Sequence, residues 1–249
     1  MGDGLVLVLT DDPADSRFFL VVKVKYDGSV VWNKRAGVNG AFGTRIVRAV
    51  ATSGGGVAVV GSIFNDGGRE DAFYMAFDAA GAAGFSGGVY GHALDDLGAG
   101  TQFLAAAIDR GGGLALAGRN TVTAGSADAW LVITGADGSV KDQRAYGGAT
   151  NDFGNGVAVP AGGGYLVTGT TTSFGGTEVW AVHADDKLNV AFTVASGGDD
   201  RATASTATFD AAVTDATCPV TPTTFTDQKT VAGTLAAATL APVVAHQAP

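Results

Sequence analysis

A unit of about 50 residues recurs along this chain, and this period restricts the fold more than any other feature. Three stretches read alike: GVAVVGS…EDAFYMAFDAAG, GLALAGR…ADAWLVITGADG and GYLVTGT…TEVWAVHADDK. In each stretch a glycine closes an apolar run, an acid follows nine or ten residues later, and an aromatic comes two residues after the acid: Gly61, Asp71 and Phe73; Gly118, Asp128 and Trp130; Gly169, Glu178 and Trp180. Such a period is typical of repeat proteins, in which each copy buries its apolar face against its neighbours.

The composition favours many short strands joined by tight turns. Of the 249 residues 46% are hydrophobic and only 16% are charged, so the chain can bury a substantial core. Glycine occupies 39 positions, which suits turns that need a positive φ angle. Disorder is not expected, because disordered segments have low hydrophobicity and dense charge.

Each unit contains four strand-like runs of five to seven residues that are rich in β-branched and aromatic side chains. In the third unit these runs are 156–160, 165–169, 179–183 and, more weakly, 189–194. In the first unit they are 45–51, 57–62, 72–78 and a poor run around Phe85. The N-terminus enters in mid-unit, with runs at 4–10, 18–24 and Val30–Trp32, which amounts to half a unit.

Short connections predict that neighbouring strands are antiparallel, because a parallel pair needs a long crossover. Gly-rich links occupy residues 53–55 and 161–163, and Asp27-Gly28 and Asp137-Gly138 join later runs. The Asp-Gly pairs predict type I′ hairpin turns. Four antiparallel strands in each unit are typical of the blade of a β-propeller. We therefore expect an all-β fold, a β-propeller of about 4–5 four-stranded antiparallel blades whose last blade is degenerate or incomplete.

Residues 1–200 are expected to form the repeat domain, with an N-terminal half-blade and three full units. Residues 201–249 contain four of the six prolines and match the unit weakly, with Thr230–Thr234 as a decayed copy of LVTGT. Residues 201–249 are compatible both with a degenerate final blade and with an extended tail. If the ring closes, residues 4–32 should supply strands to the same sheet as the final unit and so cover an exposed edge.

The charge of the chain excludes some classes of partner. With a net charge of −9 and a sequence pI of about 4.6, the chain lacks the basic surface that nucleic acids or anionic membranes require. Its densest basic group, Lys23, Lys25, Lys34 and Arg35, is expected on the solvent side of a strand pair. No apolar run is long enough for a transmembrane helix, and the first residues lack a signal-peptide pattern. Cys218 is the only cysteine, which rules out an intramolecular disulfide.

Residues 128–174, DAWLVITGADGSVKDQRAYGGATNDFGNGVAVPAGGGYLVTGTTTSF, resemble the extracellular-type, seven-bladed β-propeller repeat family, and residues 71–118 are a worn version. The resemblance covers about residues 4–200. It implies a secreted or surface-displayed scaffold, usually without a catalytic motif, and it supplies no functional residues to transfer. The chain has too few units for seven blades. It is therefore expected to form either a smaller ring or a part of a larger one.

Two short motifs suggest enzymes but have simpler explanations. Residues 84–88 spell G-x-S-x-G around Ser86, the nucleophile elbow of α/β-hydrolases, which requires a strand-to-helix turn over a parallel sheet. A chance match is expected in a chain with 39 glycines. Asp27 to Trp32 is similar to the Asp-box of sialidase-type propellers, but the glycine follows the aspartate directly. A plain hairpin explains those residues.

Acidic pairs recur at turns and could ligate Ca²⁺, although solvated turns are the simpler interpretation: Asp11-Asp12, Asp95-Asp96, Asp185-Asp186 and Asp199-Asp200. Asp152 and Asp96 hold comparable places in their units and are expected to cap turns through backbone N–H groups. His92, His183 and His246 share no metal-binding spacing. Phe73, Trp130 and Trp180 are expected to pack between units, with an aromatic platform for sugars as the alternative.

These observations predict a non-catalytic binding or display scaffold, extracellular or at the cell surface, with no catalytic, cofactor-binding or metal-binding residues and no cofactor. The expected ligand is a protein or a glycan; nucleic acid and membrane insertion are not expected. The alternatives are a carbohydrate-binding adhesin module, a structural subunit that assembles through its terminal half-blades, and, least favoured, an enzyme of sialidase or lyase type.

Overall fold

The computed structural model describes residues 4–12, 15–38, 41–64, 70–85, 88–91, 100–123, 126–173, 176–190, 205–208 and 211–215. These residues form strands, turns and loops without any helix, so the all-β prediction is confirmed for them. The chain divides into two units, Met1–Thr217 and Cys218–Pro249, and every described residue belongs to the first. A search of the described ranges finds no apolar helix of membrane-spanning length.

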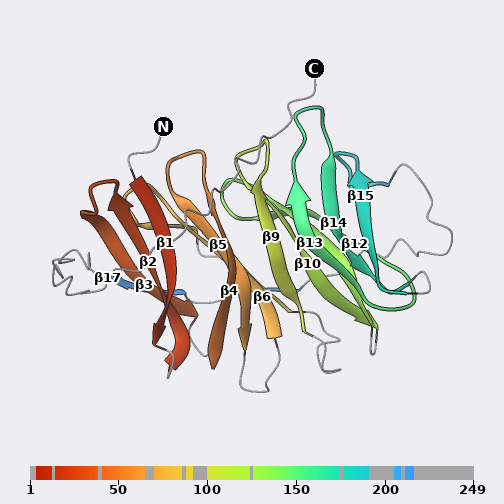
Figure 1. The fold of residues 1–249 in the computed structure, drawn as a ribbon, viewed down its shortest axis with the longest axis horizontal. Helices are drawn as coiled ribbons and strands as arrows, with labels where there is room; N and C mark the ends of the chain where they lie inside the picture. The colour runs from red at the N-terminus through yellow and green to blue at the C-terminus, as the bar shows by residue number, and fades with distance from the viewer. Residues whose placement is uncertain are drawn as a thin grey trace, which may run out of the picture. The chain divides into compact units, whose positions relative to one another are not determined.

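The strands form four antiparallel sheets that follow one another along the chain (Figure 1). The first contains β1 (Gly4–Asp12), β2 (Asp15–Lys25), β3 (Val30–Val38) and β17 (Ala211–Asp215). The second contains β4 (Gly43–Ala51), β5 (Val57–Phe64), β6 (Glu70–Phe77), β8 (Gly88–Gly91) and β16 (Ser205–Thr208), with β7 (Ala83–Phe85) also paired to β6. The third contains β9 (Gln102–Ile108), β10 (Leu114–Thr123), β11 (Ser126–Thr134) and β12 (Val140–Tyr146). The fourth contains β13 (Asp152–Ala158), β14 (Tyr165–Thr171) and β15 (Glu178–Ala184).

The strand-like runs predicted from the sequence fall on observed strands. Runs 45–51, 57–62 and 72–78 correspond to β4, β5 and β6, and the half-unit at the N-terminus corresponds to β1, β2 and β3. Of the weak run 189–194, only Asn189 and Val190 are among the described residues, and Val190 forms an isolated β-bridge with Ala184. Residues 191–194 lie outside the described ranges.

The described parts of residues 201–249 form two strands that extend earlier sheets. β16 pairs with β8 in the second sheet, and β17 pairs with β3 in the first. A late segment therefore shares a sheet with residues 4–32, but it lies along β3 and not along β1. Residues 216–249, including Thr230–Thr234, lie outside the described residues.

The hairpin turns correct one prediction. In the turn at Asp27-Gly28, the Gly28 N–H donates to Lys25 O and the Lys25 N–H donates to Ser29 O, at 3.0 and 2.8 Å. Gly28 has a φ of +85°, whereas Asp27 has no positive φ. A type I′ turn needs positive φ at both central residues, so this is a type I turn followed by a G1 bulge. The turn at Asp137-Gly138 has the same pattern, with Gly138 at φ +81°.

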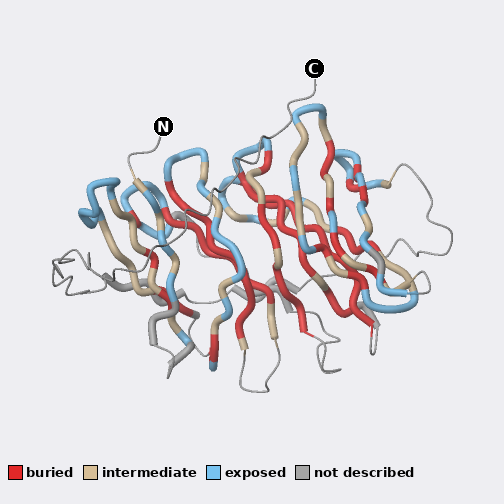
Figure 2. Tube along the Cα trace, viewed as in Figure 1, coloured by how far each residue is buried: buried red, intermediate tan, exposed pale blue. Residues whose placement is uncertain are grey.

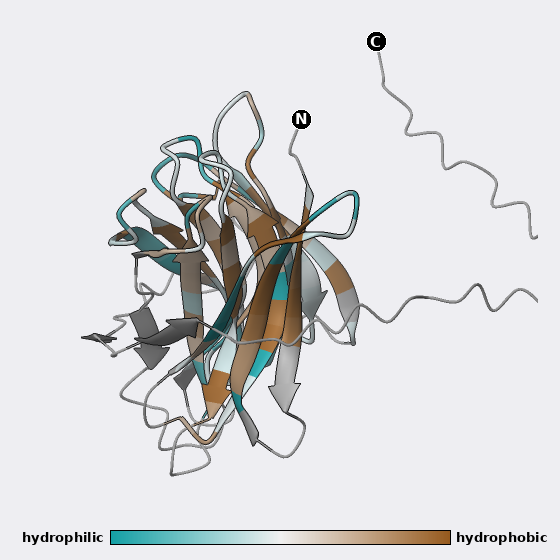
Figure 3. Cartoon of the chain, turned by 90° about the vertical axis from the view of Figure 1, so that its left-hand side faces the viewer, coloured by the Kyte–Doolittle hydropathy of each residue, from teal (hydrophilic) through white to brown (hydrophobic). Residues whose placement is uncertain are grey.

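Apolar side chains fill the space between successive sheets, which buries the middle strands on both faces (Figure 2). Along β5, Val57 and Val59 pack toward the first sheet, whereas Ala58 and Val60 pack toward the third. This explains why β5 reads as a continuous apolar run without polar alternation. In Figure 3 the hydrophobic segments likewise follow the strands, and the turns are more hydrophilic.

Each sheet places its earliest strand at one edge, and these edges follow one another. The edge strands are β1, β4, β9 and β13. Contacts link β1 with β4, β4 with β9, and β9 with β13, and the four strands appear in this order from left to right in Figure 1. The four edge strands therefore lie side by side in one row.

Candidate functional site

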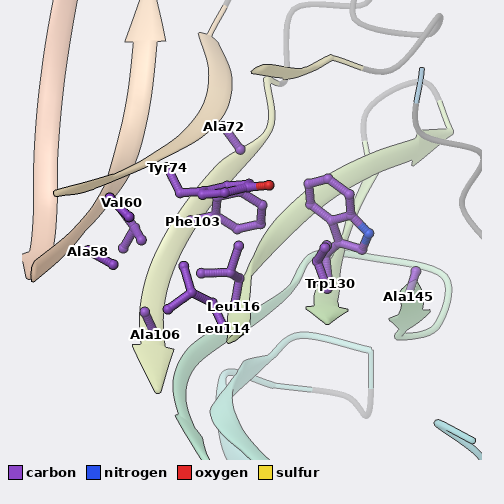
Figure 4. Packing of buried hydrophobic residues seen from close by; sticks show 12 residues of the cluster. Ala58, Val60, Ala72, Tyr74, Phe103, Ala106, Leu114, Leu116, Trp130 and Ala145 are labelled. Carbon is purple, nitrogen blue, oxygen red and sulfur yellow. The ribbon is translucent and has the colours of Figure 1, made fainter. Parts of the chain in front are cut away.

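The repeated aromatics belong to the core, as the packing interpretation predicts for two of them. Phe73 and Trp130 are 0% and 1% exposed. Trp130 stacks on Phe103 with ring centroids 5.3 Å apart, and Figure 4 shows this ring pair beside Tyr74. Trp180 is only partly buried, and its Nε1 donates to Phe153 O at 3.2 Å. Phe73 and Trp130 are therefore inaccessible to a sugar.

The two enzyme-like motifs lie in antiparallel hairpins. In the G-x-S-x-G motif, Phe85 ends β7 and Gly88 begins β8, and both strands pair with β6 in antiparallel orientation. Ser86 itself lies outside the described residues. Asp27 accepts hydrogen bonds from the N–H and Oγ of Ser29, at 2.9 and 2.6 Å, which lowers its pKa. Asp27 therefore stabilises its own hairpin, as the simpler interpretation predicts.

The acidic pair Asp185-Asp186 serves a turn. Asp185 Oδ1 accepts from the N–H groups of Lys187 and Asn189, both at 2.8 Å. Asp186 accepts from the Gly164 N–H at 2.8 Å and forms an ion pair with Arg110. These backbone hydrogen bonds, to Asn189 and to Gly164, are the main causes that lower the pKa of both carboxyls. Both carboxylates thus bind backbone N–H groups at turns, as the solvated-turn interpretation predicts.

Other predicted candidates are only partly described. The side chains of Asp11-Asp12, and the whole of Asp95-Asp96, Asp199-Asp200, His92 and His246, lie outside the described residues. His183 is exposed on β15. Within the described ranges no three His, Cys, Asp or Glu side chains converge on a common point. Asp152 caps a turn as predicted, because its Oδ2 accepts from the Gly148 N–H at 2.8 Å.

The basic group near the N-terminus does not share one solvent face. Lys34 lies opposite Val21 and Arg35 opposite Leu20, and these consecutive strand residues point to opposite faces of the sheet. The Arg35 guanidinium lies 3.7 Å from the centroid of the Phe18 ring, a cation–π contact. Only Lys25 is exposed as expected.

The candidate site is an open pocket of about 580 Å³ between the first two sheets. Its lining comes from β1 and β2 on one side and from β4 and the end of β5 on the other: Val8, Leu9, Phe18, Phe19, residues 44–49 and Phe64. Thr44 anchors β4 to the first sheet, because its Oγ1 donates to Arg17 O at 2.9 Å. Eight of the eleven lining residues are apolar.

Two arginines are the ionisable residues in the described lining. Arg45 and Arg48 are exposed and have no ion pair with any described residue. The register of β4 against β5 shifts between Ile46 and Arg48, so Arg45 lies opposite Ser62 and Arg48 opposite Val60. Because Ser62 and Val60 are two residues apart, this bulge places both arginines on the same face of β4. Val60 packs toward the third sheet, whereas Ile46 packs toward the first, so both arginine side chains lie on the face of β4 that points away from the first sheet. Arg45 and Arg48 therefore border the pocket from the far face of β4.

The rim of the pocket also carries an unpaired strand edge. β1 pairs only with β2 among the described strands, and its Leu5, Leu7 and Leu9 are 53%, 42% and 48% exposed. An edge strand presents unpaired N–H and C=O groups that can bind another extended chain. The sequence predicted the strands at this place but not the pocket. The R-I-V-R spacing alone would place the two arginines on opposite faces.

Comparison with known protein families finds no family model that matches the chain, and comparison with curated proteins finds no significant match.

Proposed function

We propose that the protein is a non-catalytic β-propeller scaffold of the extracellular or surface-displayed type, which binds an extended segment of a partner protein in the pocket between its first two sheets. The observation that carries the binding role is the pocket of about 580 Å³ together with the adjacent free edge of β1. Two exposed arginines lie on the far face of the neighbouring strand β4. The propeller interpretation is supported by the successive contacts of the edge strands β1, β4, β9 and β13.

The lining favours binding over chemistry. Arginine stays protonated at physiological pH and forms directional hydrogen bonds to carboxylates, but it is a poor general base. The ligand that fits is a segment with acidic and apolar side chains. Such a segment can add to the edge of β1 through main-chain hydrogen bonds and place its apolar side chains in the pocket. Its acidic side chains can then reach Arg45 and Arg48 by passing over the exposed strand β4. In a chain of net charge −9, two exposed arginines that form no ion pair with any described residue are a local attraction for such a ligand.

A random-peptide phage library panned against the immobilised chain tests this proposal. Peptides that combine acidic and apolar residues should be enriched, and the Arg45→Glu/Arg48→Glu variant should bind them about tenfold or more weakly. The Lys141→Glu/Lys187→Glu variant makes the same change of charge at two exposed lysines away from the pocket and should bind normally. Equal binding by the two variants would contradict the proposal. An array of glycans, probed in parallel, would favour the adhesin alternative if it alone gave binding.

The exposed leucines of β1 favour a second candidate, self-assembly through this edge. Val24, Val22 and Leu20 lie opposite Leu5, Leu7 and Leu9 in the register of β1 and β2, so this sheet face carries two rows of apolar side chains. Two copies could pair along β1 and cover it. The concentration dependence of the molar mass in solution separates this candidate from peptide binding.

A further inference from the structure

A cluster of three buried polar side chains at one end of the third sheet plays no part in the proposed function. Asn120 on β10 lies directly opposite Asp128 on β11, so both side chains are on the same face of the sheet. They are 1% and 4% exposed. Asp152, the first residue of β13 in the next sheet, is 0% exposed.

Gly147 shows that the two carboxylates approach each other. A Cβ built on Gly147 would lie 2.5 Å from Asp128 Oδ1 and 2.6 Å from Asp152 Oδ2. Both oxygens therefore lie within about 5 Å of each other, a separation that one Ca²⁺ ion can bridge with its usual distances to oxygen. Because Gly147 has no side chain, the two carboxylates can occupy the space beside its Cα atom.

Several polar atoms in this group have no hydrogen bond. Asp152 Oδ2 accepts from the Gly148 N–H and from Ser173 Oγ, at 2.8 and 2.7 Å, but Asp152 Oδ1 is buried without a partner. Both polar atoms of the Asn120 amide are also buried without partners, although the amide is next to Asp128. Buried polar atoms are almost always satisfied in folded proteins. Two of the unsatisfied atoms, Asp152 Oδ1 and the Asn120 amide oxygen, are oxygens of the kind that bind a cation.

We propose that Asn120, Asp128 and Asp152 bind one Ca²⁺ ion between the third and fourth sheets. Carboxylate and amide oxygens are the ligands that Ca²⁺ prefers, and it tolerates irregular coordination, whereas Mg²⁺ requires a regular octahedron. A divalent cation gives a partner to two buried oxygens that lack one, Asp152 Oδ1 and the amide oxygen of Asn120. The ligands come from β10, β11 and β13, so the ion would hold two sheets together. This proposal is independent of the peptide pocket.

Terbium luminescence tests the site, because Tb³⁺ replaces Ca²⁺ at oxygen ligands and Trp130 lies two residues from Asp128. The whole chain, freed of metal with a chelator, should show tryptophan-sensitised Tb³⁺ emission that Ca²⁺ displaces, and Ca²⁺ should raise its melting temperature. Asp152→Asn and Asn120→Ala should each weaken Ca²⁺ binding about tenfold or more. Asp185→Asn, which changes an exposed turn carboxylate, is the matched control and should bind Ca²⁺ normally.

Stability in chelator separates a ligand role from a structural one. The amide of Asp152→Asn keeps an oxygen for the Gly148 N–H, and it removes one of two neighbouring charges. Without Ca²⁺ this variant should therefore be at least as stable as the wild-type chain, and with Ca²⁺ it should be less stable. The proposal is overturned if the wild-type chain binds no Ca²⁺, or if Asp152→Asn and Asn120→Ala both bind it as the wild type does.

Discussion

Gly118 and Trp130 lie directly opposite each other on β10 and β11, and the glycine has no room for a side chain. A Cβ on Gly118 would lie 1.7 Å from the carbonyl oxygen of Gln102 on β9. The same relationship recurs in the other units, where Gly61 faces Phe73 and Gly169 faces Trp180. In all three units the earliest strand has a register shift beside the glycine, which brings its backbone close. The repeated glycine–aromatic pair is thus a packing unit.

Gly118→Ala should lower the free energy of unfolding by about 1–3 kcal/mol or more, because β9 must move to admit the methyl group. The measurement is urea unfolding followed by tryptophan fluorescence. Gly162→Ala is the control, because a Cβ there meets no atom within 4 Å and the residue has no positive φ. Similar unfolding curves for the two variants would contradict the close approach of β9.

Replacing the buried aromatic should cost more than replacing the partly exposed one. Trp130→Ala should lower the free energy of unfolding by about 3–5 kcal/mol, because it leaves a cavity beside Phe103. Trp180→Ala should cost clearly less, because its side chain is already in partial contact with solvent. Circular dichroism during urea unfolding measures both variants, and equal losses would contradict the difference in burial.

Two glycines in open turns isolate the cost of a positive φ. Gly28 and Gly54 both have space for a Cβ, with no atom within 4 Å, but only Gly28 has a positive φ, +85°. Gly28→Ala should therefore destabilise the chain by about 1–2 kcal/mol, since a left-handed conformation strains an alanine. Gly54→Ala should be neutral or slightly stabilising. Thermal unfolding of the pair gives the comparison; the opposite order would disprove the turn assignment.

The chain should lose stability at high pH partly through Tyr165. Burial, together with a hydrogen bond from its hydroxyl to Asp109 Oδ1 at 2.9 Å, raises the pKa of Tyr165 from 10.0 to about 12. Because the folded chain favours the neutral phenol, this stabilising contribution is complete below pH 10 and is lost as the pH rises from 10 toward about 12.

Alkaline titration monitored by tyrosinate absorbance measures this effect. Tyr165→Phe should remove a late-titrating group and flatten the dependence of stability on pH in that range. Tyr26→Phe, which changes a 73% exposed tyrosine, should leave the late step in place. Burial also raises the pKa of Tyr146, so a smaller late step should remain in Tyr165→Phe. A late step of unchanged amplitude in Tyr165→Phe would show that the group is wrongly assigned.

Leu7→Lys should reduce self-association without loss of stability. Leu7 is 42% exposed on the unpaired edge strand β1, and a lysine there opposes pairing with a second chain. Light scattering over a range of concentrations measures the molar mass. Thr168→Lys, at an exposed position on the central strand β14 of the fourth sheet, is the control and should leave the association unchanged. Association that is equal in wild type and Leu7→Lys would exclude the β1 edge.

The strands and turns of this chain were predictable because local signals specify them. Runs of apolar residues bounded by glycine marked β4, β5 and β6, and Asp27-Gly28 marked a hairpin. The turn type was predicted wrongly, because an Asp-Gly pair is compatible with a type I turn and G1 bulge as well as with type I′. Only the hydrogen bond from the Gly28 N–H to Lys25 O and the φ angles distinguish them.

The sequence by itself determined an all-β chain of repeated antiparallel strands with aromatic packing, since the period, the apolar runs and the glycines act over a few residues. Tertiary structure decided the rest. It placed β17 along β3, put Arg45 and Arg48 on one face through a bulge, and gathered Asn120, Asp128 and Asp152 from two sheets. These relationships join residues that are distant in the chain or depend on a register shift, and no local pattern of residues encodes such contacts.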